Sequence, residues 1–491
     1  MSKKIKEPFS LKLKKRWLRS NPTTALIVLI LITAFLALNL WIGSIDLAQI
    51  DVTENKVYSL TDKSIEFIKE IDKNVKIYAY GYVEDSSLVD LLKQYCREND
   101  NITYEVLTEE TNKGKVEEYG LSDNYPVVVV ETGEASTMID GQTEFYSYDY
   151  TTGQEVDLTE QTITNTILNL TIKDKPKVYL LTGHGEYTEG EMSILTTYLG
   201  NEAYEYEAIN LLTKNNIPED CNVLLMMSPT TDLLENETTI ILNYINNGGN
   251  IIYAKDTEEN GKAYPNYQKI LDVYGLAVEN GYVYETDSTA MVSGYPNIVM
   301  PQIEPYTDIT EQIYSDGGYL LFPYAQKITK ADEETAANLN VEYETLLKSS
   351  EKSYYVTDVS ANISTITSTA EEGSSELAIS AVKTIDTNSE EEKKSKIIVV
   401  GNGMFITDTM VNVISSNYPI SFMGNNKDFM MNSIAYLTDR TDTLTIRKEM
   451  NTSTYAPTEQ QDTIVKLIIF GIPILIIISG IAVWNRRKKK R

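Results

Sequence analysis

Two long apolar runs, one near each end of the chain, constrain the fold more than any other feature of this sequence. The first run extends from Ala25 to Ile45 and the second from Leu467 to Trp484. A helix rises about 1.5 Å per residue, so either run is long enough to cross a hydrocarbon core of about 30 Å. The sequence therefore predicts two transmembrane helices, over residues 23–45 and 464–485.

A cleavable signal peptide is the main alternative for the first run, because a basic segment followed by an apolar stretch is typical of such peptides. The run is longer than the usual apolar part of a signal peptide. The sequence that follows, WIGSIDLAQIDVT, offers no clear small-x-small cleavage motif and no cysteine for lipidation. We therefore expect an uncleaved membrane anchor.

Basic residues gather at both ends of the chain. Residues 1–20 hold eight Lys or Arg and the single acid Glu7, and the chain ends in RRKKKR. The positive-inside rule then predicts that the tails 1–22 and 486–491 are cytoplasmic and that the large region between the two spans is extracellular. The other 29 basic and 70 acidic residues give the intervening part a net charge of −41. Such a surface repels nucleic acid, so no nucleic-acid partner is expected. The two apolar runs predict a cell-membrane protein that contacts the lipid bilayer.

The region between the spans is too long for a single core and predicts two or three domains. Residues 46–172 alternate between helical and strand patterns, which predicts a small α/β domain. Its first helix, SLTDKSIEFIKEI, begins at Ser59 or Thr61 as the N-cap. The order of elements is similar to a thioredoxin-type layout, but no CxxC motif follows the first strand, so redox chemistry is not implied.

Residues 173–440 predict a larger α/β domain with a parallel sheet covered on both faces, because near-continuous apolar strands alternate with helices. The expected strands are 177–183, 204–210, 222–230, 250–256 and 396–406, and the expected helices are 191–200, 235–249 and 426–440. The pattern weakens over about 256–394, which we interpret as an insertion. Residues 441–463 lack strong periodicity and are expected to form a stalk into the second span.

Several of these segments occur in a characteristic order between two spans. They are DVTENKVYSLTDKSIEFIKEI, VYLLTGHGEYTEGEMSILTTYL, NVLLMMSPTTDLLENETTIILNYINNGGNIIYAKD, and KIIVVGNGMFITDTM with NKDFMMNSIAYLTDR. This order resembles GldG-like proteins, which are auxiliary membrane components of ABC-type transporters named from a bacterial gliding-motility system. The resemblance implies an extracytoplasmic component that works with a separate ATPase and permease. It also implies that the larger domain is similar to the glutamine-amidotransferase-like α/β fold.

Our leading hypothesis is a non-catalytic auxiliary subunit of an ABC-type transport system, whose exterior domains bind substrate, cell-envelope material such as glycan, or partner subunits. No cofactor is expected, and no GxxxxGK[ST] loop is present to cradle phosphates. Two alternatives stay open. One is a membrane-anchored hydrolase that uses a crevice at His184 and Glu186, and the other is a structural protein that binds the envelope.

The stretch VYLLTGHGEYTEG contains the only histidine in the chain. It follows a predicted strand, and open α/β sheets bind ligands at the carboxyl ends of their strands. Glycines on both sides of the histidine would let the backbone approach a ligand closely. The candidate ligand-binding residues are therefore His184, Glu186, Gly183 and Gly185, joined by Ser228 and Asp256 from the ends of other strands.

No catalytic residue and no metal ligand is predicted from this stretch. Nucleophilic catalysis needs a Ser or Cys beside a base, and Cys221 precedes its strand, at the opposite end of the sheet. A metal site built from His184, Glu186 and Asp256 would lack diagnostic spacing. We favour a structural interpretation, in which the glycines turn the chain and His184 bonds a neighbouring loop. Whether Cys96 and Cys221 form a disulfide stays open.

Overall fold

The computed structural model describes residues 59–440 except 109, 111, 122–125, 150–153, 259–260, 360–365, 387–391 and 414–415, together with Thr33 and Ala37. The two expected spans, apart from Thr33 and Ala37, lie outside these described residues, as do the tails and the stalk. Among the described residues, no helix is both long enough and apolar enough to cross a membrane. The chain divides into two compact units, Met1–Val57 and Tyr58–Arg491, and all the elements below belong to the second.

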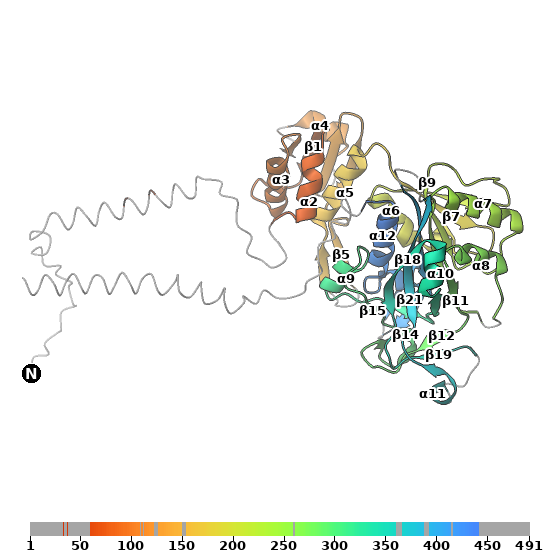
Figure 1. Cartoon of the computed structure of the whole chain (residues 1–491). Helices are drawn as coiled ribbons and strands as arrows, with labels where there is room; N and C mark the ends of the chain where they lie inside the picture. The colour runs from red at the N-terminus through yellow and green to blue at the C-terminus, as the bar shows by residue number, and fades with distance from the viewer. Residues whose placement is uncertain are drawn as a thin grey trace, which may run out of the picture. The chain divides into compact units, whose positions relative to one another are not determined.

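The first part of this unit is a four-stranded sheet with helices around it (Figure 1). The strand order is β2-β1-β3-β4, in which β1 pairs parallel with β2 and antiparallel with β3. The strands are β1 (Val75–Tyr80), β2 (Ile102–Leu107), β3 (Val127–Thr132) and β4 (Ser136–Asp140), and the helices are α2 (Asp62–Glu70), α3 (Ser87–Glu98), α4 (Lys113–Glu118) and α5 (Thr159–Thr171). Thr61 rather than Ser59 is the N-cap of α2, since its side chain accepts the Ser64 N–H.

Helix α5 is part of this small α/β core. Its Ile163 and Ile167 are fully buried with Ile77 and Val128 of the sheet. Near the start of the helix, the Tyr95 hydroxyl donates to the Glu160 carbonyl at 3.1 Å. A hairpin of β5 (Tyr146–Asp149) and β6 (Gln154–Asp157) precedes the helix.

The second part is built on a ten-stranded mixed sheet in the order β11-β17-β21-β22-β10-β9-β7-β8, with β15 and β18 off this path. Five neighbours run parallel: β8 (Glu205–Asn210), β7 (Lys177–Thr182), β9 (Cys221–Met227), β10 (Asn250–Ala254) and β22 (Lys393–Val400). The expectation of a parallel sheet is wrong beyond β22, because β21 (Glu376–Asp386) pairs antiparallel with it. Only six residues separate these two strands, too few for the crossover that a parallel pair needs.

The segment 256–394, predicted as an insertion, adds strands to the same sheet. Of these strands, β18 pairs antiparallel with β21, and β15 pairs with β18. Strands β17 and β11 continue the large sheet beyond β21, and the other strands of the segment form two small sheets, β12-β19-β20 and β13-β14-β16. The elements are α8 (Pro265–Asp272), β11 (Leu276–Val278), β12 (Tyr282–Tyr284), β13 (Met291–Val292), β14 (Tyr295–Val299), β15 (Gln302–Ile303), α9 (Glu311–Ser315), β16 (Phe322–Pro323), β17 (Ile328–Lys330), α10 (Glu333–Leu339), β18 (Val341–Lys348), β19 (Tyr354–Val356), α11 (Ile366–Thr369) and β20 (Glu371–Glu372).

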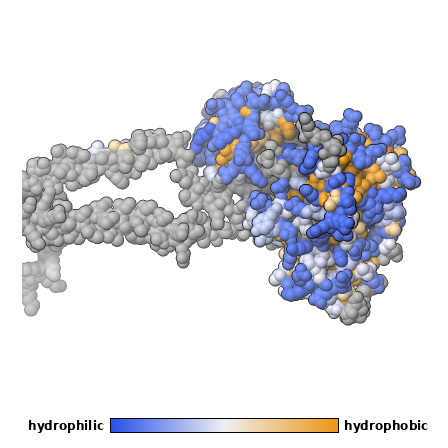
Figure 2. All heavy atoms as spheres, in the orientation of Figure 1, coloured by the Kyte–Doolittle hydropathy of each residue, from blue (hydrophilic) through white to orange (hydrophobic). Residues whose placement is uncertain are grey.

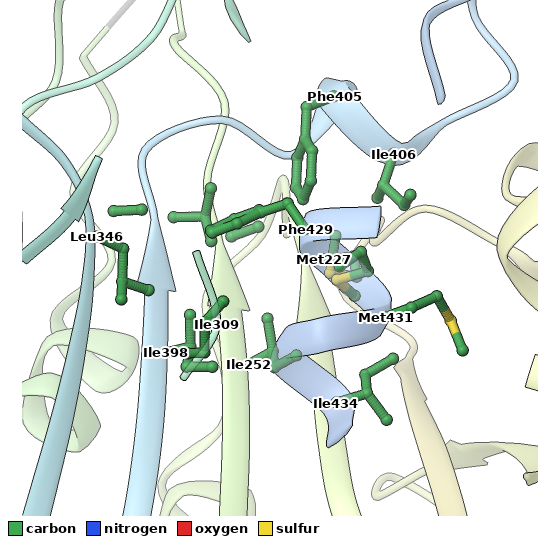
Figure 3. Close-up of a cluster of buried hydrophobic side chains, with 14 of the residues drawn as sticks. Met227, Ile252, Ile309, Leu346, Ile398, Phe405, Ile406, Phe429, Met431 and Ile434 are labelled. Atoms are coloured by element: carbon green, nitrogen blue, oxygen red, sulfur yellow. The ribbon is translucent and has the colours of Figure 1, made fainter. Parts of the chain in front are cut away.

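Helices cover the sheet on both faces, because alternate side chains of a strand point to opposite sides. Val178 and Leu180 of β7 pack in one core with α6 (Ser193–Asn201) and α12 (Asn426–Leu437). Figure 3 shows Phe429, Met431 and Ile434 of α12 in this core, close to Met227 and Ile252. Tyr179 and Leu181 face the other core, with α7 (Glu235–Asn246) and α8. The face of the molecule in Figure 2 is mostly hydrophilic over the described residues.

Short elements complete the edge of the sheet at which the parallel strands end. They are η1 (Glu189–Glu191), η3 (Met404–Ile406), β23 (Met410–Val413), β24 (Ser416–Pro419) and η4 (Ile420–Phe422). The first of them follows β7, and η3 follows β22. The loops after the parallel strands therefore meet at one edge, where the candidate residues lie.

Candidate functional site

The candidate residues all follow parallel strands at their carboxyl ends. Gly183 and His184 come after β7, Ser228 after β9, and Asp256 after β10. From β7 the chain passes through α6 to β8 on one side and then returns to β9 on the other side. The strand order therefore reverses between β7 and β9, which is where open α/β sheets form a ligand crevice.

His184 is buried, with 4% of its surface exposed. Its Nδ1 lies 3.1 Å from Glu186 Oε1, and its Nε2 lies 2.9 Å from Glu237 Oε2. The two carboxylate side chains are only 1% and 0% exposed. The hydrogen bond to Glu186 is the largest influence on the pKa of His184 and raises it, against the opposing effect of burial. The geometry thus favours an imidazolium held between two buried carboxylates.

Each carboxylate of this cluster has further partners. Glu186 accepts the backbone N–H of His184 at 2.7 Å and the Tyr267 hydroxyl at 3.0 Å. Glu237 accepts the Leu234 N–H at 2.8 Å and so caps the start of α7. Burial, followed by the charge of Glu186, raises the pKa of Tyr267 far above its ordinary value, so the phenol remains a donor. The cluster thereby ties the loop after β7 to both α7 and α8.

The crevice between β7 and β9 is closed by the protein's own backbone. The His184 carbonyl accepts the N–H groups of Thr230 and Thr231 at 2.9 and 2.8 Å. Gly183 and Gly185 have φ of 116° and 82°, which favour glycine. A Cβ at position 185 would collide with the Thr230 hydroxyl. The two glycines therefore allow a close contact between the loop after β7 and the loop after β9. This contact lies at the place where a ligand would otherwise bind.

Ser228 and Asp256 form a second cluster. The Ser228 hydroxyl donates to Asp256 Oδ2 at 2.7 Å, and the Tyr187 hydroxyl donates to the same oxygen at 2.9 Å. Asp256 Oδ1 accepts the N–H groups of Gly403 and Met404 at 2.6 and 3.0 Å. Ser228 itself has φ of 52° and is buried. Asp256 therefore joins the loops that follow β7, β9 and β22.

These contacts do not make a nucleophile–base pair. Both imidazole nitrogens of His184 face carboxylates, and Ser228 donates its proton to Asp256 rather than to the histidine. The three residues considered for a metal are divided between the two clusters. Over the part of the chain that the structure describes, no group of three or more His, Cys, Asp or Glu could hold a metal ion. The observed chemistry is that of a buried structural network.

Two members of the network escaped the sequence analysis. Glu237 lies 53 residues beyond His184, and its one sequence signal is an acidic residue in the first turn of a predicted helix. Tyr267 lies 81 residues beyond its partner Glu186, in the segment whose pattern was weak. The structure does place His184 beside Glu186 and Ser228 beside Asp256, at the edge where the sequence predicted them.

Both cysteines are free thiols, which answers the question left open by the sequence. Cys96 is half-buried on α3, and Cys221 is buried at the start of β9. Burial raises the pKa of both thiols, that of Cys221 to about 12. Neither thiol is activated for nucleophilic chemistry.

The fold and these contacts define an α/β protein with a buried polar network at the carboxyl edge of its parallel strands. A family model described as "ABC-type uncharacterized transport system" matches residues 175–433, which is more than half of the chain. The chain belongs to this family of auxiliary components of ABC-type transport systems. This result confirms the ABC-auxiliary class that the order of segments implied. No curated protein matches the chain.

Several solved structures are similar to part of the chain, all at low identity. The N-terminal domain of mmIFT52 is 12% identical over 53% of this chain and 97% of its own, with a TM-score of 0.35. A ThuA-like protein from Parabacteroides merdae is 11% identical over 54% of this chain and 91% of its own, with a TM-score of 0.32. The exo-β-1,4-mannosidase Op5Man5 from Opitutaceae bacterium strain TAV5 is 10% identical over 65% of this chain and 44% of its own, with a TM-score of 0.26.

Proposed function

We propose that this protein is a non-catalytic, membrane-anchored subunit of an ABC-type transport system, and that its large exterior part binds substrate or partner subunits. The observation that carries the proposal is membership of the auxiliary family over residues 175–433. An auxiliary component acts beside a separate ATPase and permease, and the sequence has no phosphate-binding GxxxxGK[ST] loop of its own.

The His184 network supports the non-catalytic part of the proposal. A general base needs a ring nitrogen that can reach the reacting proton. In this protein both nitrogens of His184 are engaged by buried glutamates, and the neighbouring crevice is closed by the Thr230 and Thr231 backbone. No geometric feature of this cluster favours the hydrolase alternative.

The apolar runs over 25–45 and 467–484 support a two-span arrangement with both termini in the cytoplasm. In this arrangement the described domains are extracellular, and the spans pack against the permease. Gly471 and Gly480 would permit a close approach of helices in the second span. Within the auxiliary family, the order of the sequence segments favours a GldG-like protein with thioredoxin-like and amidotransferase-like domains.

The test is purification of the full-length protein from its native cells in mild detergent, followed by mass spectrometry of the proteins that accompany it. We expect an ATPase and a multi-span permease in near-equal amounts. A matched variant replaces both apolar runs by unrelated transmembrane sequences, which keeps the anchoring but removes the native helix surfaces. We expect this variant to lose the permease. Recovery of the native protein without either partner would contradict the proposal.

A further inference from the structure

A pocket of about 380 Å³ lies beside the His184 network, at the carboxyl end of β10. Its wall comes from the end of β10 and the described residues of the loop after it, from α8, and from residues in or beside β11 and β17. Tyr267 belongs to both places, since it lines the pocket and donates to Glu186. The network therefore fixes one wall of a cavity that the sequence did not predict.

Gln326 is the first sign that the pocket accommodates a ligand. The residue is 1% exposed, and its Nε2 donates to the Glu279 carbonyl at 3.2 Å. Its Oε1, by contrast, is buried without a hydrogen-bond partner among the described residues. A buried carbonyl oxygen without a donor is costly, and most such groups in folded proteins are satisfied. An N–H or O–H group of a bound molecule would satisfy this oxygen.

The charges of the pocket are the second sign. Among the described residues that line it, Lys255 and Lys262 carry positive charge and Glu258 carries negative charge. Lys255 is buried and donates to Glu258 at 2.5 Å and to the Pro229 carbonyl at 2.8 Å. Lys262 donates to the Thr230 carbonyl at 2.8 Å and is exposed. Among the described residues, Glu258 pairs with Lys255 and no carboxylate pairs with Lys262, so a small anion would neutralise the charge of Lys262.

The third sign is the position of one aromatic ring, that of Tyr264, beside these cations. The ammonium groups of Lys255 and Lys262 lie 4.3 and 5.5 Å from the centroid of the Tyr264 ring. The ring thus holds the two cations together on the wall. Burial lowers the pKa of Lys255, so a bound anion would also compensate the cost of keeping its charge in this site.

We propose that this pocket binds a small organic anion that also carries an N–H or O–H donor. The carboxylate would lie at Lys255 and Lys262, and the donor would reach Gln326 Oε1. Amino acids and short peptides share this chemistry with sugar acids, so both are sources of such a ligand. The proposal names a substrate class for the exterior part but does not depend on association with a permease, and the two are tested separately.

The test measures binding to the purified full-length protein in detergent by titration calorimetry, with thermal shift as a second readout. One panel holds amino acids and dipeptides, and the other holds glucuronate and galacturonate. Acetate, which has no second donor, and glucose, which has no charge, are the chemical controls. We expect at least one compound from a panel to bind at micromolar to millimolar concentration and to bind more tightly than both controls. The panel that contains the binder identifies the source.

Two variants test whether the ligand binds in this pocket. Gln326→Met removes the amide at similar size, and Lys262→Gln removes an exposed charge, so the second variant is informative even if the first fails to fold. Each is expected to weaken binding about tenfold. The matched controls Gln302→Met on β15 and Lys269→Gln on α8 change exposed residues that do not line the pocket, and should bind as the wild type does. Absence of binding by every compound, or equal affinity of Lys262→Gln and the wild type, would overturn the proposal.

Discussion

Nε2 of His184 lies 2.9 Å from Oε2 of Glu237, although 53 residues separate them in the chain. The contact joins the loop after β7 to the first turn of α7, and Glu186 lies against the other ring nitrogen. Two buried carboxylates thus share the only imidazole of the protein. The burial of these two carboxylates depends on the positive charge of the His184 imidazolium, because an unpaired buried carboxylate is costly.

His184→Ala should therefore destabilise the large domain by about 3–5 kcal/mol, as expected when one partner of a buried ion pair is removed. Denaturant unfolding of the full-length protein, followed by circular dichroism, measures the change. Thr239→Ala on the exposed side of α7 is the matched control and should leave stability nearly unchanged. A loss no larger than that of the control would show that His184 is dispensable.

The effect of losing the His184 charge can be separated from the effect of losing its packing. A triple variant, His184→Leu with Glu186→Gln and Glu237→Gln, removes the charge on all three side chains. It should recover part of the stability that His184→Ala loses, because neutral amides are less costly to bury than unpaired carboxylates. If the triple variant is less stable than His184→Ala, the charges are not what the histidine compensates.

Stability should also fall as the pH rises through the titration of His184. The folded-state pKa of this residue is raised above its ordinary value of 6.5. Its stabilising contribution is therefore fully present below about pH 6.5, the unfolded pKa, and is lost as the pH rises through the higher folded pKa. Since the chain has one histidine, His184→Gln should flatten this part of the stability curve. An unchanged slope in His184→Gln would assign the effect to another group, such as the N-terminal amine.

Tyr267→Phe should cost about 1–2 kcal/mol, because it leaves Glu186 Oε1 without one of its donors in a buried site. The measurement is again equilibrium unfolding of the full-length protein. Tyr295→Phe makes the same chemical change at a residue that is 43% exposed and should have almost no effect. Equal effects of the two substitutions would argue that the hydroxyl of Tyr267 contributes nothing to the network.

The sequence predicted the parallel strands because their apolar runs are almost continuous, as in β9 with Val223 and Leu225 buried on one face and Leu224 and Met226 on the other. It did not predict that β18 and β21 extend the same sheet. Strand β18 mixes exposed Glu342 with buried Leu346, and its partners are fixed by long-range pairing rather than by local pattern. The sheet edge was thus predictable from particular strands, but its antiparallel extension was not.

In the candidate site too, local sequence pattern did not predict which distant side chains come together. His184 and Glu186 are two residues apart, so a glycine-flanked turn could bring them together. Glu237, Tyr267 and Gln326 reach the region from distant segments, and only the folded sheet brings them there. A local motif can therefore predict where a site lies, while tertiary packing decides which polar groups are satisfied.

The second cluster gives a test of how tightly the loops after β9 and β22 pack. A Cβ added at Gly403 would collide with the Ser228 hydroxyl and lie 3.2 Å from Asp256 Oδ2. Gly403→Ala should therefore cost about 1–3 kcal/mol through overpacking. Ser228→Gly removes the hydroxyl in the way and also suits the φ of 52° at that position.

The double variant Gly403→Ala with Ser228→Gly should consequently be less destabilised than the sum of the two single variants. Residues in direct contact commonly show coupling of about 0.5–3 kcal/mol, and relief of the collision gives the coupling its sign. Gly190→Ala is the matched control, since a Cβ there meets only the Thr188 hydroxyl, at 4.0 Å, and should combine additively with Ser228→Gly. Strict additivity in the Gly403 pair would mean that the loops can separate without cost. Asp256 would then not hold them together as its hydrogen bonds to these loops indicate.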